Sequence, residues 1–436
     1  MIGQFYGRPL DRAESFFWFL DRLSSTNFSV IAEGHGPLAP DDVQAALDRA
    51  QARHSLLAAS VETNAEHLLR FAARPATGIA LQCLDLDGWH DRLAELNIQP
   101  FGVGEYPLMR AYLFASGDGH WVFALVFHHS ISDARSGFHL LNEVLRDAVE
   151  TWVGFSAVAP RSPLTELYPA KYYGELAQRA GEQMRASRIA LLNDIGPPET
   201  YRGHRSSQEA PAPRLVPLRL PREQVKALLH RARQEQATIN GLVGAAQLIA
   251  LRQLFGDSEA HTLGLTCAAD LRPYLRTPID ASTPGLGATL VSSLHRVRAS
   301  EKTWHLARRV TTAIRQQIQA GAGHLFYHAM PPTERMPATA EGIEAFRGLM
   351  ASRPSSSLLS NVGQLPPLPN LPGLRLKALS FALCPTEVQP LFTAVTGHAD
   401  GLAINLNHNV RQFAQDVADA VARSMQGLLF EAALTA

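Results

Sequence analysis

The stretch ALVFHHSISDARSGFHLL, residues 124–141, decides the fold class that we predict. Its apolar run is typical of a strand that ends at His128 and His129, and the residues after Asp133 have the apolar spacing of a helix. Neighbouring residues of a strand point to opposite faces, so one imidazole should enter a cavity and the other the core. Asp133 stands at the predicted N-cap, where its carboxylate can accept backbone N–H groups.

Three interpretations of this His-His-x-x-x-Asp string compete. A metal site is disfavoured, because the two rings diverge and no further ligand follows at a usual spacing, so we predict no metal. A structural cluster would need only a buried histidine satisfied by Asp133. In the catalytic interpretation, a neutral imidazole takes a proton from an alcohol or amine near neutral pH.

Length and composition describe a folded protein with more than one core. The chain has 436 residues, of which 46% are hydrophobic and 18% charged, and two domains are expected at this length. Forty basic residues balance forty acidic ones, which argues against a nucleic-acid partner. Cys83, Cys267 and Cys384 are far apart and fit a reducing compartment. We find neither a signal peptide nor an apolar run that would span a membrane, and we expect a cytoplasmic monomer.

Strand and helix patterns alternate in both halves of the chain. We predict an α/β fold of two sandwiches with mixed sheets. The first subdomain should cover residues 1–195 and carry the histidines. A linker rich in Pro, Ser and Arg should follow at 196–214, and the second subdomain should cover 215–436.

The segment HHSISDARSG, residues 128–137, resembles the HHxxxDG signature of the chloramphenicol-acetyltransferase-like superfamily, which includes condensation domains and acyltransferases. Further segments resemble the superfamily in the same order: GRPLDRAESFFWFLDR (7–22), PDDVQAALDRAQARHSLLAASVE (40–62), CAADLRPYL (267–275) and LLSNVGQLP (358–366). The last segment and the chain length look most like the stand-alone polyketide-associated acyltransferases.

The resemblance implies two similar subdomains in a V with a channel between them. His129 would be the general base in mid-channel. Asp133 would be a structural support paired with Arg272 of the second subdomain. The resemblance and the strand pattern together give the expected channel residues: His128, Ala134, Ser136, Ser360, Asn361 and Gly363. Ala134 departs from the family, which usually has Gly after the aspartate, and its methyl group would narrow the channel or restrict the backbone.

The implied reaction transfers an acyl group from a thioester to a hydroxyl acceptor and forms an ester in secondary-metabolite or lipid biosynthesis. The donor would be acyl-CoA or an acyl-carrier or peptidyl-carrier protein, and the acceptor a small alcohol or amine. No bound cofactor is implied, because the thioester is a co-substrate. Since no G-x-S-x-G elbow is present, we expect direct attack without an acyl-enzyme. Two alternatives stay open: a free-standing condensation enzyme that joins carrier-bound intermediates as an amide or ester, and a degenerate member that recruits a partner without catalysis.

Overall fold

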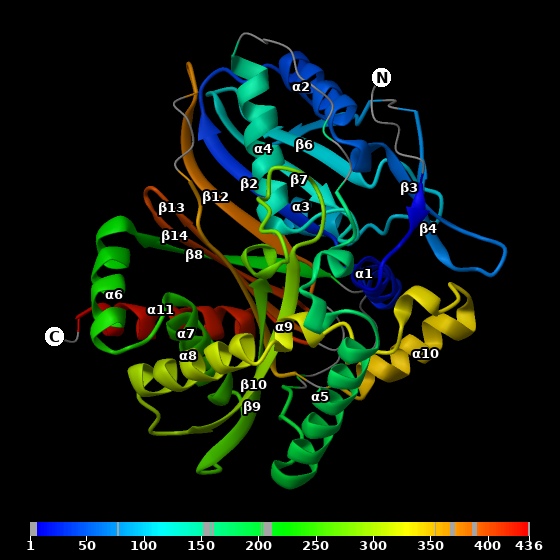
Figure 1. Cartoon of the computed structure of the whole chain (residues 1–436). Helices are drawn as coiled ribbons and strands as arrows, with labels where there is room; N and C mark the ends of the chain where they lie inside the picture. Colours follow the sequence, from blue (N-terminus) through cyan, green and yellow to red (C-terminus); the bar gives the residue numbers. More distant parts are fainter. Residues whose placement is uncertain are drawn as a thin grey trace.

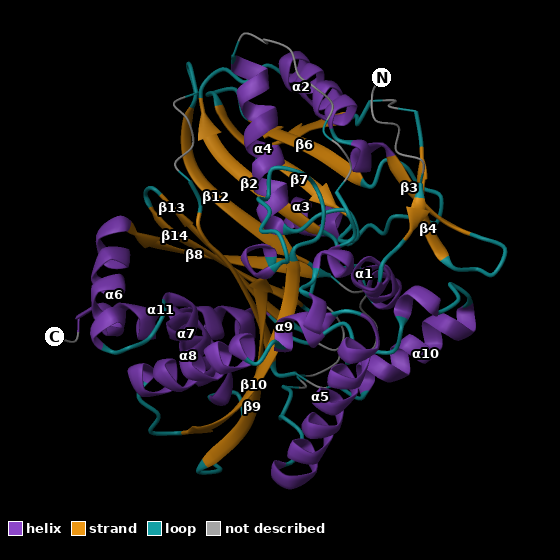
Figure 2. Ribbon diagram, viewed as in Figure 1, coloured by secondary structure: helices purple, strands orange, loops and turns teal. Residues whose placement is uncertain are grey.

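The computed structural model of the chain has two α/β bodies, one above the other in Figure 1. It describes residues 7–75, 78–150, 158, 161–201, 203, 212–353, 355–366, 371–385 and 390–434. Each body has a mixed sheet with helices on it, as Figure 2 shows, so the predicted pair of α/β sandwiches is confirmed.

The first body is built on a five-stranded sheet in the order β12-β2-β7-β6-β5. Its strands are β2 (Phe28–His35), β5 (Leu81–Asp85), β6 (Met109–Ala115), β7 (His120–Phe127) and β12 (Arg375–Leu383). Strands β6 and β7 form an antiparallel hairpin, and β7 is buried along nearly its whole length. Helices α2 (Pro40–Arg53) and α4 (Ala134–Val149) pack on each other, and α4 also packs on β2. Side chains of α3 (Trp89–Asn97) share a separate apolar cluster with strands of this sheet.

The second body has a six-stranded sheet in the order β10-β9-β11-β13-β14-β8. Its strands are β8 (Pro213–Pro221), β9 (Ala260–Asp270), β10 (Ala288–Arg298), β11 (Ser357–Gln364), β13 (Leu391–His398) and β14 (Gly401–Asn409). Parallel pairing joins β11 to both β9 and β13, whereas the other neighbours are antiparallel. The helices of this body are α6 (Arg222–Gln234), α7 (Ile239–Arg252), α8 (Thr303–Gln319) and α11 (Gln415–Leu434).

One strand crosses between the bodies. β12 follows β11 in the chain, yet it pairs antiparallel with β2 in the first sheet, from Arg375 opposite His35 to Leu383 opposite Phe28. The predicted subdomain boundaries of 1–195 and 215–436 stay a prediction, and residues 202 and 204–211 of the linker at 196–214 lie outside the described residues. In three dimensions, however, residues 375–383 complete the sheet of the first half.

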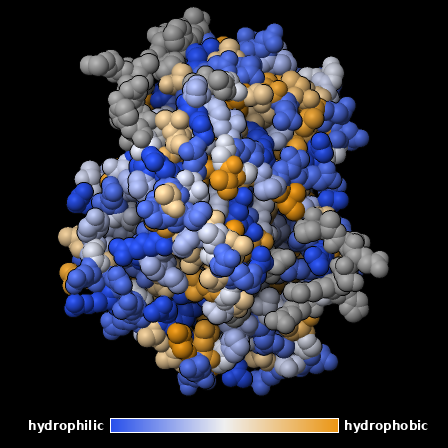
Figure 3. Space-filling model, turned by 90° about the vertical axis from the view of Figure 1, so that its right-hand side faces the viewer, coloured by the Kyte–Doolittle hydropathy of each residue, from blue (hydrophilic) through white to orange (hydrophobic). Residues whose placement is uncertain are grey.

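The remaining elements lie where the bodies meet and at the edge of the first body. The helices are α1 (Arg12–Leu23), α5 (Gly174–Ile195), α9 (Ala322–Leu325) and α10 (Ala340–Ala351); the short strands are β1 (Arg8–Pro9), β3 (Ala59–Thr63) and β4 (Leu69–Ala73); the 3₁₀ turns are η1 (Ser55–Ala58), η2 (Leu164–Leu167), η3 (Ala170–Tyr172), η4 (Arg272–Tyr274) and η5 (Thr333–Arg335). Helix α1 contacts η2, η5 and α10, so it ties the N-terminal residues to segments of the second half. Figure 3 shows the face on the right of Figure 1; the coloured part is mainly hydrophilic, with small separate apolar patches.

Candidate active site

His129 lies in the turn that joins β7 to α4. Its ring stacks on Phe17 of α1, with 3.9 Å between ring centroids and 14° between planes, and a tilted Phe28 lies 4.9 Å away. The side chain is therefore held between α1 and β2, and residue His129 keeps 9% of its surface exposed. These two aromatic neighbours restrict the imidazole to one orientation.

The hydrogen bond of His129 determines its tautomer. Its Nδ1 lies 3.0 Å from the carbonyl oxygen of Ser132. A carbonyl only accepts, so Nδ1 donates and Nε2 of the neutral ring keeps its lone pair. Burial lowers the pKa of His129, although the hydrogen bonds with the backbone and the charge of Asp133 oppose the shift. The ring is consequently neutral at pH 7 and has the protonation state of a general base.

His128 points the other way, into the core. The backbone N–H of Ser130 donates to its Nδ1 over 3.2 Å, and its Nε2 faces Asp21 at 3.8 Å. Burial lowers the pKa of His128 to about 4. The ring is 1% exposed and meets Phe101 edge-on. This side chain is therefore buried just after the end of β7, and its placement among the channel residues stays a prediction.

Asp133 caps helix α4 and faces the second half of the chain. Its Oδ1 accepts the N–H of Ser136 at 3.1 Å, and its Oδ2 accepts the N–H of Gly287 at 2.7 Å. Arg272 Nη2 lies 2.9 Å from both carboxylate oxygens. Burial on its own would raise the pKa of Asp133, but the charge of Arg272 and the two backbone donors outweigh it and hold the pKa below its usual value. The carboxylate is thus a permanent anion whose described bonds lead away from the imidazole.

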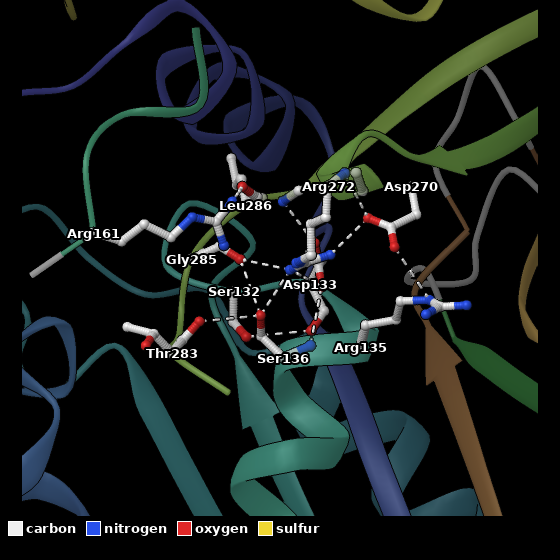
Figure 4. A network of polar contacts seen from close by, with 12 residues as sticks. Ser132, Asp133, Arg135, Ser136, Arg161, Asp270, Arg272, Thr283, Gly285 and Leu286 are labelled. Atoms are coloured by element: carbon white, nitrogen blue, oxygen red, sulfur yellow. Dashed lines mark hydrogen bonds and ion pairs between the residues drawn. The ribbon is translucent and has the colours of Figure 1, made fainter. Parts of the chain in front are cut away.

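The predicted ion pair between Asp133 and Arg272 is present and buried. Arg272 is 3% exposed, and its Nη1 also donates to Asp270 at 3.0 Å, so it lies between two carboxylates. Figure 4 shows this network, in which Arg161 reaches the carbonyl of Leu286 from the other side. Asp270 belongs to β9 and Asp133 caps α4. The network therefore joins the two bodies at the start of α4, four residues after the candidate base.

Ser136 and Ala134 belong to the same helix start, and their surroundings differ. The Ser136 hydroxyl accepts from Arg272 Nη2 at 2.8 Å and lies 3.3 Å from the carbonyl oxygens of Thr283 and Gly285. Ser136 is buried in the network, and its assignment as a channel residue stays a prediction. Ala134 is the half-buried first residue of α4 and has the helical backbone that alanine favours, so replacing the family's glycine introduces no backbone strain.

The Ser-Asn-x-Gly segment lies on β11, beside the start of α4. Ser360 and Asn361 are half-buried, and Asn361 Oδ1 accepts the N–H of Gly363 at 2.8 Å. Gly363 has a φ of +76°, a conformation that favours glycine. Arg135 bridges the two bodies here, because its Nη2 donates to the carbonyl of Val362 at 2.7 Å. A channel role for Ser360, Asn361 and Gly363 stays a prediction.

The sequence analysis did not single out several residues of the site. Phe17, Asp270 and Gly287 contact His129, Arg272 and Asp133 respectively. Phe17 and Asp270 are within the two segments at 7–22 and 267–275 that resemble the superfamily. The resemblance therefore included these residues but assigned no role to either. Gly287 contributes only a backbone N–H, which no side-chain pattern reveals.

Other chemistries find little support among the described residues. No group of three or more His, Cys, Asp or Glu side chains there could hold a metal ion. Burial raises the pKa of the Cys267 thiol to about 12, so this thiol is no ready nucleophile. In the same part of the chain, no helix is both long enough and apolar enough to cross a bilayer.

Known proteins with this architecture are acyltransferases and condensation domains. The trichothecene 15-O-acetyltransferase of Fusarium sporotrichioides superposes with a TM-score of 0.74 at 13% identity, covering 98% of this chain and 95% of that one. Polyketide synthase associated protein 5 from Mycobacterium tuberculosis gives 0.67 at 17% identity, with 98% of both chains covered. The first condensation domain of the calcium-dependent antibiotic synthetase gives 0.69 at 18%, over 99% and 97% of the two chains. At these identities the likeness establishes the fold: a chloramphenicol-acetyltransferase-like pair of α/β subdomains.

Sequence comparison places the chain within this class. Residues 209–426, half of the chain, match the family described as "Phthiocerol/phthiodiolone dimycocerosyl transferase C-terminus", and the chain belongs to that family. It is an acyltransferase of the condensation-domain-like kind. Cyclosporin synthetase of Tolypocladium inflatum is 27% identical in an alignment 290 residues long that covers 60% of this chain; the chain spans only 2% of that protein.

Proposed function

We propose that the protein transfers an acyl group from a thioester to a hydroxyl acceptor, with His129 as the general base. One observation carries the proposal: Ser132 fixes the proton of His129 on Nδ1, which leaves Nε2 as the acceptor. The Nε2 lone pair takes the proton of the alcohol as its oxygen attacks the thioester carbonyl. The tetrahedral intermediate then expels the thiolate, and the thiolate takes the proton from the imidazolium to leave as a thiol.

In this mechanism Asp133 positions the base without accepting a proton. Its carboxylate oxygens are occupied by Arg272, Ser136 and Gly287. It fixes the start of α4, and with it the turn that carries Ser132 and His129. The donor would be acyl-CoA or an acyl group on a carrier protein, and it reacts by direct transfer.

The test is turnover of the His129→Ala variant, measured as thiol released from a panel of acyl thioesters with alcohol acceptors. The variant should lose about 10²–10⁴-fold in rate, the usual contribution of a general base, and keep its fold. The wild-type rate should fall only at a pH lower than the ordinary histidine pKa of 6.5, because burial lowers the pKa of His129 and the imidazole gains its proton at more acid pH. His230→Ala, an exposed histidine on α6, is the matched control and should keep full activity. Near wild-type turnover by His129→Ala would remove this residue from the base role, and no transfer from any thioester by the wild type would favour a recruiting protein.

The match to cyclosporin synthetase supports a second candidate, a free-standing condensation enzyme that forms an amide or ester between carrier-bound intermediates. The same base serves both reactions, so product analysis separates them. Matched alcohol and amine acceptors, offered with one donor either as its CoA ester or on a carrier protein, should show which bond is made and which donor is used.

A further inference from the structure

A cavity of about 380 Å³ lies between α1, α5, α10 and the β9–β10 strands of the larger sheet. Its apolar lining comes from several elements: Phe16, Leu20, Leu290, Phe326, Met330 and Met350. The first two flank Phe17, the residue that stacks on His129, so the cavity and the candidate base share one stretch of helix α1.

Helix α5 closes the cavity with a single face. Met184, Ser187, Arg188 and Leu191 line it, and this spacing of three and four residues puts them on one side of the helix. One turn earlier, Gly181 packs so closely on the backbone of His328 that a Cβ atom would lie 2.6 Å from its carbonyl carbon. Gly181 therefore lets this side of α5 pack against the backbone of His328. From the next turn on, the same side of the helix faces the cavity.

Two arginines line this cavity without a counter-charge. Arg188 comes from α5, and Arg353 follows α10 and donates one Nη2 bond to the carbonyl of Ala329 at 2.9 Å. No carboxylate within the described residues forms an ion pair with either guanidinium. Burial and the charges of Arg188 and Arg185 together lower the pKa of Arg353 to about 10, and Arg188 and Arg353 line the same cavity, so the cations lie within electrostatic reach of one another. Most arginine side chains in such half-buried positions pair with an anion, since holding unpaired cations together is costly.

The position of the cavity along β10 gives its distance along the strand from Gly287, the residue that contacts Asp133. Gly287, just before this strand, donates to Asp133, whereas residues 290–294 line the cavity. At about 3.4 Å per residue, the wall runs from about 10 to about 24 Å along the strand from Gly287. A pantetheine arm, whose two amides make it comparable to about five residues of extended chain, would be about 17 Å long.

We propose that Arg188 and Arg353 bind an oxyanion group of the substrate at one end of this cavity, while α1 and the segments around α9 and α10 hold the apolar body. The inference rests on the proposed function, because acyl transfer brings in ligands of this kind. The oxyanion is either the phosphate of a phosphopantetheine arm or the carboxylate of a hydroxy-acid acceptor. Guanidinium forks match both groups.

Calorimetric titration with two matched pairs of probes distinguishes these sources. The first pair is 4′-phosphopantetheine and pantetheine, which differ only in the phosphate. The second pair is 3-hydroxydecanoate and its methyl ester, which differ in the carboxylate charge. In one of the pairs, the wild type should bind the charged member about 10- to 100-fold more tightly, as expected for charge-assisted hydrogen bonds.

Arg188→Gln is the main variant, because no described hydrogen bond of the folded protein depends on this side chain. It should abolish most of the charge preference, and Arg353→Gln should do the same. Arg188→Lys should retain part of it. Arg179→Gln, on α5 but paired with Glu175 at the exposed surface, should leave the preference unchanged. A preference in the phosphate pair identifies the donor arm, and one in the carboxylate pair identifies the acceptor.

A charge preference that is missing in both pairs, or that survives in both glutamine variants, would overturn the proposal. Binding is measured without turnover, so the result is independent of the base assignment. The His129→Ala variant should keep the preference even though its activity is lost.

Discussion

Asp133 and Arg272 form a buried ion pair that aims the base in the proposed mechanism. Removal of one partner leaves the other charge buried, which typically costs about 3–5 kcal/mol. Asp133→Ala and Arg272→Ala should therefore each lower the free energy of unfolding by about that amount, and activity should fall because the turn that carries His129 loses its anchor. Urea denaturation and a turnover assay on the same samples provide the measurement.

The double variant Asp133→Ala/Arg272→Ala is the control for this pair. Because it leaves no Asp133–Arg272 charge pair to break, it should be less destabilised than the sum of the two single variants. An inactive Asp133→Ala protein with unchanged stability would instead assign a proton-relay role to the carboxylate and revive a triad-like mechanism.

At the scale of elements, helix α4 approaches β2 through a glycine. A Cβ atom on Gly137 would lie 2.9 Å from Val30 Cγ1 and 3.3 Å from the ring of Phe28. Gly137→Ala gains about 1 kcal/mol of helix propensity but forces this contact apart, and overpacking of a core typically costs about 1–3 kcal/mol. We expect net destabilisation and slower turnover, since Phe28 also contacts the ring of His129.

Gly427→Ala on α11 is the control that separates the effect of overpacking from the gain in helix propensity. No atom lies within 4 Å of a Cβ built at Gly427, so the same propensity gain should appear without the clash. Thermal denaturation should therefore shift the melting temperature upward for Gly427→Ala and downward for Gly137→Ala. Equal shifts would mean that α4 and β2 adjust freely, contrary to the close packing observed.

How much of the molecule the sequence predicts differs among these elements. The apolar pattern of residues 124–141 predicted strand β7 and helix α4, and the order of motifs predicted the superfamily. Strand β5 was missed because it is a short edge strand with no buried residue to mark a pattern. Helix α10 was also missed, although Thr339 caps it with a bond to the N–H of Gly342. The pairing of β12 with β2 joins residues more than 300 positions apart, which no local pattern encodes.

On the scale of the whole molecule, β12 makes the two bodies one structural unit. Phe381 of this strand is 2% exposed and contacts Phe138 of α4 and Phe392 of β13 edge-on, at 6.3 Å and 6.1 Å between centroids. A single ring therefore packs on elements of both bodies. Together with the Asp133–Arg272 pair, this contact predicts that both bodies unfold in one transition.

Phe381→Ala tests this coupling. The variant should lose about 3–5 kcal/mol of stability, the usual cost of truncating a buried phenylalanine. The lost contacts belong to both bodies, so both should be destabilised together. Urea denaturation is followed by far-UV circular dichroism and by tryptophan fluorescence. The two curves should still coincide, at a lower midpoint than in the wild type. Phe430→Ala is the matched control: its ring, at 54% exposure on α11, should change stability by less than about 0.5 kcal/mol. Two separate transitions in Phe381→Ala would show that the bodies fold independently. In that case β12 would be a tether between domains and would not couple their unfolding.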